Sequence, residues 1–412
     1  PDGNHLEESG GDGGMKWEYK TLDQLGTVSR GKSKHRPRND PKLFGGKYPF
    51  IQTADVKNAD YYITKYSDTY NESGLAQSKL WDKGTLCITI AANIADTGVL
   101  AFPACFPDSI MGFVPFEGVA NTRFIKYCFD RLQRDCKQIS QGTAQDNLSW
   151  EKLSTIKFCI PEYKEQCRIA DILSAYDDLI ENNQKQIKLL EEAAQRLYKE
   201  WFVDLRFPGH ENTKIVDGVP EGWSKSTVSE VSAVLRRGIS PKYNEKARGI
   251  VINQKCIRQT IVSYDEARTQ EKKYPAELEM MESDIVICST GAGTLGRVGQ
   301  IFEAKGNATL DSHVTLIRAN ERVGQQYLFW SLKMQQDYLM SAGKGSTNQL
   351  ELSRETIGNC KILMPEQKIA EQAEKNFVAI HNKMKECSMQ IARLRESRDL
   401  LLPNLMSGEV EA

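Results

Sequence analysis

The feature that most constrains the fold of this chain is an internal duplication with an offset of about 204 residues. Trp17 opens the first copy and Trp223 opens the second, and a short run rich in β-branched residues follows in each, at 84–89 and at 283–288. Each copy then has an amphipathic helical stretch, a polar turn, and a strand that ends in Pro161 or Pro365. The helical stretches carry Ile125, Phe129 and Cys136 in one copy and Leu328, Leu332 and Leu339 in the other, and the polar turns lie at 142–149 and 345–353. The period is too long for a solenoid and predicts two similar domains.

A long heptad pattern follows each copy. Apolar side chains alternate by three and four residues, and one polar residue interrupts each stripe, Asn183 in the first and Arg398 in the second. One such stripe would also fit a helix packed on a domain core, but two at equivalent positions favour helices that pack on each other as a coiled coil. The predicted coiled-coil positions are Ile169, Leu173, Tyr176, Ile180, Ile187, Leu190 and Leu197, and then Phe377, Ile380, Met384, Ile391, Leu394 and Leu401.

The pattern therefore predicts an α+β fold in which two domains of mixed α/β structure are each followed by a long helix. We expect the helices to form an antiparallel coiled coil with internal pseudo-two-fold symmetry, and a helix of about 38 residues would span roughly 57 Å as a spacer. The expected boundaries are a disordered leader or tag at 1–14, the first domain at 15–161, its helix at 162–206, a linker at 207–222, the second domain at 223–364, its helix at 365–403 and a tail at 404–412.

Composition excludes several classes of protein. No apolar run approaches the roughly 18 residues that a membrane span requires, and no secretory signal opens the chain. The ten cysteines form no C-x-x-C pair and the five histidines lie far apart, so we expect no metal site. Cysteines scattered through apolar contexts are typical of a reducing compartment, so a cytoplasmic location is expected.

Positive charge is gathered in two places although the net charge is only −1. Residues 30–47 and 236–258 each hold seven Lys and Arg against one acidic residue, Asp40 or Glu245. A single run of this kind also fits a solvated loop face, whereas its recurrence in both copies favours phosphate binding.

Three short motifs suggest catalysis or nucleotide binding but lack the context that either requires. Gly291-Ala-Gly293-Thr-Leu-Gly296 fits G-x-G-x-x-G, yet the residues after it predict a hairpin and not the helix that a dinucleotide site needs. Gly343-Lys-Gly-Ser346 reverses the order of a P-loop. Asp284 with Glu303 and Lys305 resembles the metal-holding layout of many nucleases, which leaves a self-contained metal-dependent nuclease as an alternative. We predict no catalytic residues in this chain.

The segment Leu197–Gly209 (LYKEWFVDLRFPG), with Val219-Pro-Glu-Gly-Trp223 after it, closely resembles specificity subunits of type I restriction-modification enzymes. Pro161 to Ala170 and Pro365-Glu-Gln-Lys-Ile-Ala370 match the family at the start of each long helix, and the resemblance extends over residues 15–410. It implies two target recognition domains, each reading half of a split double-stranded DNA sequence, and helices that fix the unread gap.

The family also implies partners: two methyltransferase subunits and restriction or motor subunits. S-adenosylmethionine, ATP and Mg would be used by those partners, with no cofactor in this chain. The remaining alternative is a coiled-coil scaffold that binds other proteins. A scaffold would not bind DNA with an affinity that falls steeply with salt, whereas a DNA-recognition subunit would.

On this reading the basic segments contact phosphates, and forked donors and acceptors near them contact bases. The polar turns at 142–147 and 345–349 could also meet DNA or cap the nearby strands. The DNA-binding candidates are Arg30, Lys32, Lys34, Arg36, Arg38, Lys47 and Gln52 in the first domain, and Arg236, Arg237, Lys242, Arg248, Asn253 and Gln254 in the second.

Overall fold

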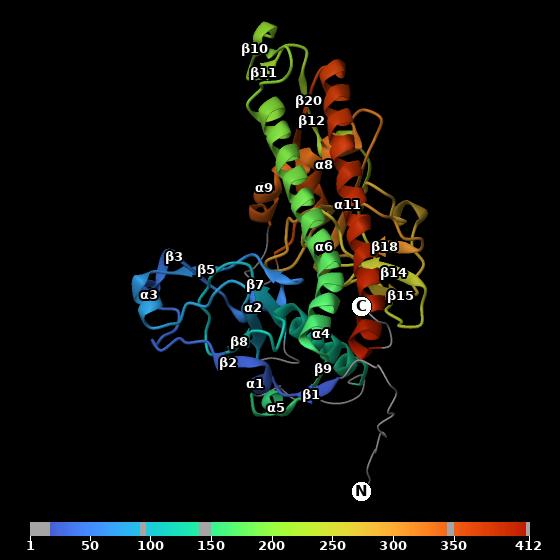
Figure 1. Cartoon of the computed structure of the whole chain (residues 1–412). Helices are drawn as coiled ribbons and strands as arrows, with labels where there is room; N and C mark the ends of the chain where they lie inside the picture. The colour runs from blue at the N-terminus through green and yellow to red at the C-terminus, as the bar shows by residue number, and fades with distance from the viewer. Residues whose placement is uncertain (1–16, 91–95, 140–149, 344–349, 409–412) are drawn as a thin grey trace. The chain divides into compact units, whose positions relative to one another are not determined.

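The computed structural model describes residues 17–90, 96–139, 150–343 and 350–408. The chain divides into two compact units: unit 1 comprises residues 1–181 and 391–412, and unit 2 comprises residues 182–390. Each unit contains one of the two predicted domains together with part of each long helix (Figure 1). The expected leader at 1–14 lies outside the described residues.

The centre of unit 1 is a five-stranded sheet in the order β2-β8-β6-β7-β4, antiparallel except where β4 meets β7. Its strands are β2 (Gly26–Arg30), β8 (Ile110–Pro115), β6 (Leu86–Thr89), β7 (Thr97–Leu100) and β4 (Tyr62–Ile63). Two antiparallel pairs accompany it, β3 (Phe44–Phe50) with β5 (Asp68–Tyr70) and β1 (Glu18–Lys20) with β9 (Phe158–Ile160). The helices are α1 (Leu22–Leu25), η1 (Pro41–Leu43), α2 (Thr53–Lys57), α3 (Glu72–Ala76), α4 (Thr122–Ile139) and α5 (Trp150–Thr155).

Unit 2 has a four-stranded sheet in the order β13-β19-β16-β17. These strands are β13 (Ser232–Arg237), β19 (Val314–Ala319), β16 (Ile285–Cys288) and β17 (Val298–Gln300). A second sheet joins β15 (Arg268–Gln270), β14 (Gly249–Ile252) and β18 (Ala308–Leu310), while β12 (Ser224–Thr227) pairs with β20 (Lys361–Met364) and β10 (Ile215–Val216) with β11 (Val219–Pro220). The helices of this domain are η3 (His210–Asn212), α7 (Val228–Val231), η4 (Gln254–Cys256), η5 (Ala276–Leu278), α8 (Gln325–Met334), α9 (Gln336–Ser341) and α10 (Arg354–Gly358).

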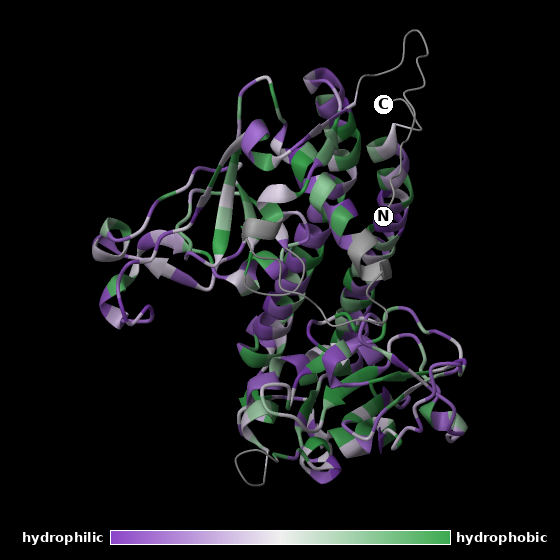
Figure 2. Cartoon of the chain, turned by 90° about the horizontal axis from the view of Figure 1, so that it is seen from below, coloured by the Kyte–Doolittle hydropathy of each residue, from purple (hydrophilic) through white to green (hydrophobic). Residues whose placement is uncertain are grey.

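The two domains repeat the same strand order, because β2-β8-β6-β7 corresponds to β13-β19-β16-β17. In each, the first and last strands pair with each other, and a four-residue helix with a capping box at Thr21 or Thr227 follows the first strand. The inner strands β6 and β16 are buried along their whole length, which explains why both are continuous apolar runs. Figure 2 shows hydrophobic residues along the sheet strands and hydrophilic residues in many of the loops. The duplication and the mixed α/β fold predicted from the sequence are confirmed.

The long helices are α6 (Tyr163–Tyr198), which continues as a π-helical turn, η2 (Lys199–Val203), and α11 (Gln367–Ser407). In unit 1, Asp177 of α6 accepts a hydrogen bond from Arg398 of α11, and Leu173 shares a buried cluster with Leu402 and Leu405. In unit 2, Cys387 of α11 donates to Gln186, 3.8 Å away, and Tyr198 shares a buried cluster with Phe377. In each unit, later residues of α6 contact earlier residues of α11. The two helices therefore run antiparallel.

All the predicted coiled-coil positions are buried or half-buried. Ile169, Leu173, Ile180, Phe377, Met384 and Ile391 are buried, and Tyr176, Ile187, Leu190, Leu197, Ile380, Leu394 and Leu401 are half-buried. The second helix extends to Ser407 and not to 403, because Leu405 and Met406 remain buried in the core of unit 1. The helical stretch of the second copy is two helices, α8 and α9, separated at Gln335, whereas its counterpart α4 is continuous.

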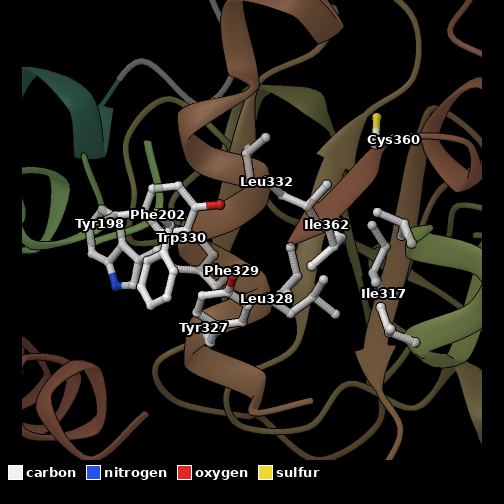
Figure 3. Packing of buried hydrophobic residues seen from close by; sticks show 14 of the residues in the cluster. Tyr198, Phe202, Ile317, Tyr327, Leu328, Phe329, Trp330, Leu332, Cys360 and Ile362 are labelled. Carbon is white, nitrogen blue, oxygen red and sulfur yellow. The ribbon is translucent and has the colours of Figure 1, made fainter. Parts of the chain in front are cut away.

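Aromatic side chains join the end of α6 to the second domain. Phe202 packs edge-on against Tyr327 of α8 at 4.7 Å between ring centroids and also contacts Trp223. Figure 3 shows Tyr198 and Phe202 lying beside the aromatic residues of α8. The N-cap residue of α8 is Gly324, which has no side chain to cap the helix, and Glu374 of α11 instead accepts hydrogen bonds from the amides of Gln326 and Tyr327.

Within the described residues, no helix has the length and apolar character to cross a membrane.

Candidate nucleic-acid interface

The two basic segments occupy equivalent places, each leaving the sheet at an end strand. The first runs from Arg30 at the end of β2 to Lys47 in β3, and the second runs from Arg236 near the end of β13 past η4. In the first segment Arg30, Lys32, Lys34, Arg36, Arg38, Lys47 and the nearby Gln52 are all exposed. In the second, Arg236, Lys242 and Arg248 are exposed, and Arg237, Asn253 and Gln254 are half-buried.

Several candidates of unit 1 already have protein partners. Arg38 forms an ion pair with Asp108 at 2.7 Å, and Lys47 forms one with Glu72 at 3.2 Å. Arg36 donates to the backbone carbonyl oxygens of Ser33 and His35 at 2.7 and 2.8 Å, and Gln52 donates to Asp68 at 2.7 Å. A DNA contact by any of these four side chains would have to replace or share an existing interaction.

In unit 2 the pairing is more complete. Arg236 pairs with Glu277, Lys242 with Glu271, and Arg258 with Glu266 at 3.7 Å. Arg237 pairs with Glu351 at 2.7 Å and also donates to the backbone oxygen of Leu352 at 3.1 Å. The hydrogen bond from Lys242 lowers the pKa of Glu271, and Glu271 in turn raises the pKa of Lys242. Arg248 is exposed and has no ion pair among the residues that the structure describes.

The polar candidates lie at a matching junction in both units. Gln52, two residues after the end of β3, is the N-cap residue of α2, and Asn253, directly after β14, is the N-cap residue of η4. Asn253 accepts from the amide of Lys255 and donates to the backbone oxygen of Glu266 at 2.6 Å. Gln254 keeps a buried side-chain oxygen without a hydrogen-bond partner in the described structure, beside Gly291.

Sequence reasoning missed the acidic partners. Asp108, Glu72, Glu277 and Glu351 lie far along the chain from the cations they pair with, so counting charge within a segment could not reveal them. It also missed a stack in which Arg268 lies over the exposed ring of Tyr243, with 3.5 Å from the guanidinium carbon to the ring centroid.

The glycine motif is a turn between strands. Gly291, Gly293 and Gly296 all have positive φ in the loop between β16 and β17, and β17 pairs antiparallel with β16. Without a helix to follow it, this loop lacks the N-terminal amides of a dinucleotide site. The P-loop-like Gly343–Ser346 and the polar turns at 142–147 and 345–349 lie largely or wholly outside the described residues.

The nuclease-like carboxylate, Asp284, is buried in an ion pair. Arg318 donates to both of its oxygens, at 2.5 and 2.7 Å, and the amide of Met281 donates at 2.7 Å. Burial raises the pKa of Asp284, and Arg318 opposes that shift. Glu303 is exposed on a different segment. Across the described part of the chain, no cluster of three His, Cys, Asp or Glu side chains could hold a metal ion.

Comparison with known proteins identifies relatives over nearly the whole chain. Residues 15–192 match the family described as type I restriction modification DNA specificity domain. The chain is 26% identical to the type I restriction enzyme MjaIX specificity subunit of Methanocaldococcus jannaschii, covering 96% of this chain and 93% of that protein. It is 26% identical to the HindI specificity subunit of Haemophilus influenzae over 64% of this chain and 71% of that one.

A solved structure shares the fold. The crystal structure of a type I restriction-modification system S subunit from M. genitalium covers 98% of both chains with a TM-score of 0.56 at 17% identity. The matched domain and the similarity along nearly the full length agree with the duplicated fold: the chain is similar, from end to end, to specificity subunits of type I restriction-modification enzymes.

Proposed function

We propose that this chain recognises a bipartite double-stranded DNA sequence, each domain reading one half, and directs partner subunits to that sequence. The observation that carries the proposal is that one fold occurs twice, with the same strand order, while the residues at the candidate surface differ between the copies. Two readers of the same architecture but different surface chemistry suit two different half-sites. The similarity to specificity subunits supports a chain that recognises DNA and leaves catalysis to its partners.

The chemistry would belong to the partners. We propose two methyltransferase subunits that transfer a methyl group from S-adenosylmethionine to adenine, and restriction or motor subunits that use ATP and Mg to translocate and cleave DNA. The similarity to specificity subunits of restriction enzymes supports assembly with such subunits, and their number remains part of the proposal.

The decisive experiment is co-expression with the partner methyltransferase, followed by mapping of every methylated adenine. The expected target has two defined parts separated by unread positions. Replacement of residues 223–363 with the corresponding domain of a relative should change one part only. A contiguous target, or a change in both parts, would contradict the proposal.

The nuclease alternative is disfavoured by the ion pair between Asp284 and Arg318, which neutralises the carboxylate that a metal would need. Purified chain should leave supercoiled DNA intact in Mg or Mn, and cleavage lost in Asp284→Asn would support the nuclease. A scaffold that binds only protein would show no steep loss of DNA affinity with salt.

A further inference from the structure

Three cations of unit 1 form a row at the end of β2 and in the segment that follows it. Arg30, Lys32 and Lys34 are exposed, and they alternate with Gly31 and Ser33, which are buried. The alternation of exposed and buried residues places the three cations on the solvent side of the segment. The amides of Gly31 and Lys32 donate to backbone oxygens of Ile110 and Phe106, at 2.8 and 3.0 Å, which holds this segment against the chain that leads into β8.

The charges of this row are not neutralised by the protein. None of the three side chains has an ion pair among the described residues, and two carboxylates of the neighbouring segments, Asp108 and Asp40, have other partners. Asp108 pairs with Arg38, and Asp40 is 2.9 Å from His35. The hydrogen bond from the backbone of Lys42 lowers the pKa of Asp40, so this carboxylate is engaged locally.

The equivalent segment of unit 2 can be identified residue by residue from its backbone. The amides of Gly238 and Ile239 donate to Val314 and Leu310, at 3.0 and 2.8 Å, as those of Gly31 and Lys32 donate in unit 1. Both glycines are required by close contact, because an added Cβ would lie 2.4 Å from a carbonyl oxygen at Gly31 and 2.2 Å from one at Gly238. Gly31 therefore corresponds to Gly238.

This correspondence shows that unit 2 lacks the row. Arg30 corresponds to Arg237, whose guanidinium is occupied by Glu351 and Leu352. Lys32 corresponds to Ile239, which packs against a buried hydrophobic cluster, and Lys34 corresponds to Pro241. The first domain thus keeps three unpaired outward cations at positions where the second domain keeps one paired arginine and two uncharged residues.

We propose that the two domains hold DNA unequally: the row of Arg30, Lys32 and Lys34 anchors the phosphate backbone in unit 1, and unit 2 has no counterpart. This inference rests on the proposed function. Each phosphate contact by a cation releases counterions, so the row makes DNA affinity steeply dependent on salt. Phosphate contacts carry no sequence information, so losing the row weakens binding without changing the target.

The test measures how the affinity of the full chain, in complex with its methyltransferase partner, depends on salt. A fluorescent duplex that carries the mapped target is titrated between about 50 and 200 mM salt, with the slope of log K against log salt as the readout. The triple variant Arg30→Gln, Lys32→Gln, Lys34→Gln should reduce the magnitude of this slope by up to about 2.7, or about 0.9 per contact. The methylated sequence should stay the same.

A second triple variant, Arg236→Gln, Arg237→Gln, Lys242→Gln, removes cations of unit 2 that are paired within the protein. It should change the slope by less than about 1. Pro241→Lys introduces into unit 2 a cation at the position equivalent to Lys34, and it should increase the magnitude of the slope by about 0.9. Circular dichroism melting of each variant shows that it is folded.

The outcomes separate this inference from the proposed function. If the wild-type complex binds with a steep slope but the unit 1 variant keeps that slope, or the unit 2 variant loses as much of it, the asymmetry is refuted while DNA recognition stands. If the wild-type complex shows neither salt-dependent binding nor methylation of a defined sequence, the proposed function itself fails.

Discussion

Removal of the Arg398 side chain should destabilise unit 1, because Arg398 pairs with a buried carboxylate. Its guanidinium donates to Asp177 of α6, which also accepts a hydrogen bond from Tyr127 of α4 at 2.5 Å. The side chain of Asp177 is 2% exposed and that of Arg398 is 20% exposed. Burial raises the pKa of Asp177, and Arg398 opposes this shift. Three helices therefore meet at one buried carboxylate that needs its cation.

Arg398→Met keeps an apolar stem but leaves Asp177 without its charged partner. Breaking a buried pair from one side costs about 3 to 5 kcal/mol of unfolding free energy, because a buried charge remains uncompensated. Chemical denaturation monitored by circular dichroism measures the loss. Asp177→Leu combined with Arg398→Met removes both charges, so it should recover most of the stability.

Arg395→Ala is the matched control, since Arg395 lies on the same helix and pairs with Asp60 at 2.9 Å, with side chains that are 41% and 49% exposed. An exposed pair of this kind contributes less than about 1 kcal/mol. In Arg398→Met the pKa of Asp177 rises further, so the folded state takes up a proton more readily than the unfolded state, and the deficit against wild type should shrink from pH 7 to pH 5. Equal losses in the Arg398 and Arg395 variants, or a deficit that grows on acidification, would refute this reasoning.

Three further predictions concern other buried positions. His381 donates to Gln300 at 3.0 Å, and burial lowers the pKa of His381 from 6.5 to about 4. Because the unfolded state takes up the proton at higher pH than the folded state, the free energy of unfolding should fall by about 2 kcal/mol from pH 7 to pH 5. Denaturation curves of His381→Gln should show a weaker dependence on pH. Phe377→Ala, at a fully buried residue, should cost about 3 to 5 kcal/mol by the same measurement, against less than about 1 for Val378→Ala, which is 37% exposed; equal costs would contradict the packing. Gly31→Ala should cost about 1 to 3 kcal/mol, because the new Cβ would meet a backbone oxygen at 2.4 Å, and a thermal melt unchanged from wild type would show that the segment can move aside.

The elements that the sequence predicted well are those with strong periodic or repeated signals. The heptad positions are all buried or half-buried, because a stripe spaced by three and four residues has one face to bury. The repeat located β6 and β16, since strands buried along their full length leave continuous apolar runs. Elements without such a signal were missed: the break at Gln335 divides α8 from α9, and no glycine or proline marks it.

The candidate site was less predictable because ion pairing depends on contacts between distant segments. The two basic segments have equal charge in the sequence, yet Glu277, Glu271 and Glu351 pair with cations of the second segment, while Arg30 and Lys32 of the first have no such partner among the described residues. A local count of Lys and Arg cannot distinguish a cation that is free to meet phosphate from one that is already paired. The fold supplies that distinction.

The two units also differ in how a long helix is joined to its domain. Tyr176 and Ile380 occupy the same place in the two apolar stripes, so Asp177 on α6 corresponds to His381 on α11. Both side chains are buried and both hydrogen-bond to their own domain, but one depends on a cation and the other on remaining neutral. The position that matches Arg398 is Ala194, which is fully buried, so unit 2 has no room for the same ion pair. Acidification should therefore destabilise unit 2 through protonation of His381, whereas loss of the Arg398 cation should destabilise unit 1. The two copies thus share the packing of their helices but differ in the polar contacts that join each helix to its domain.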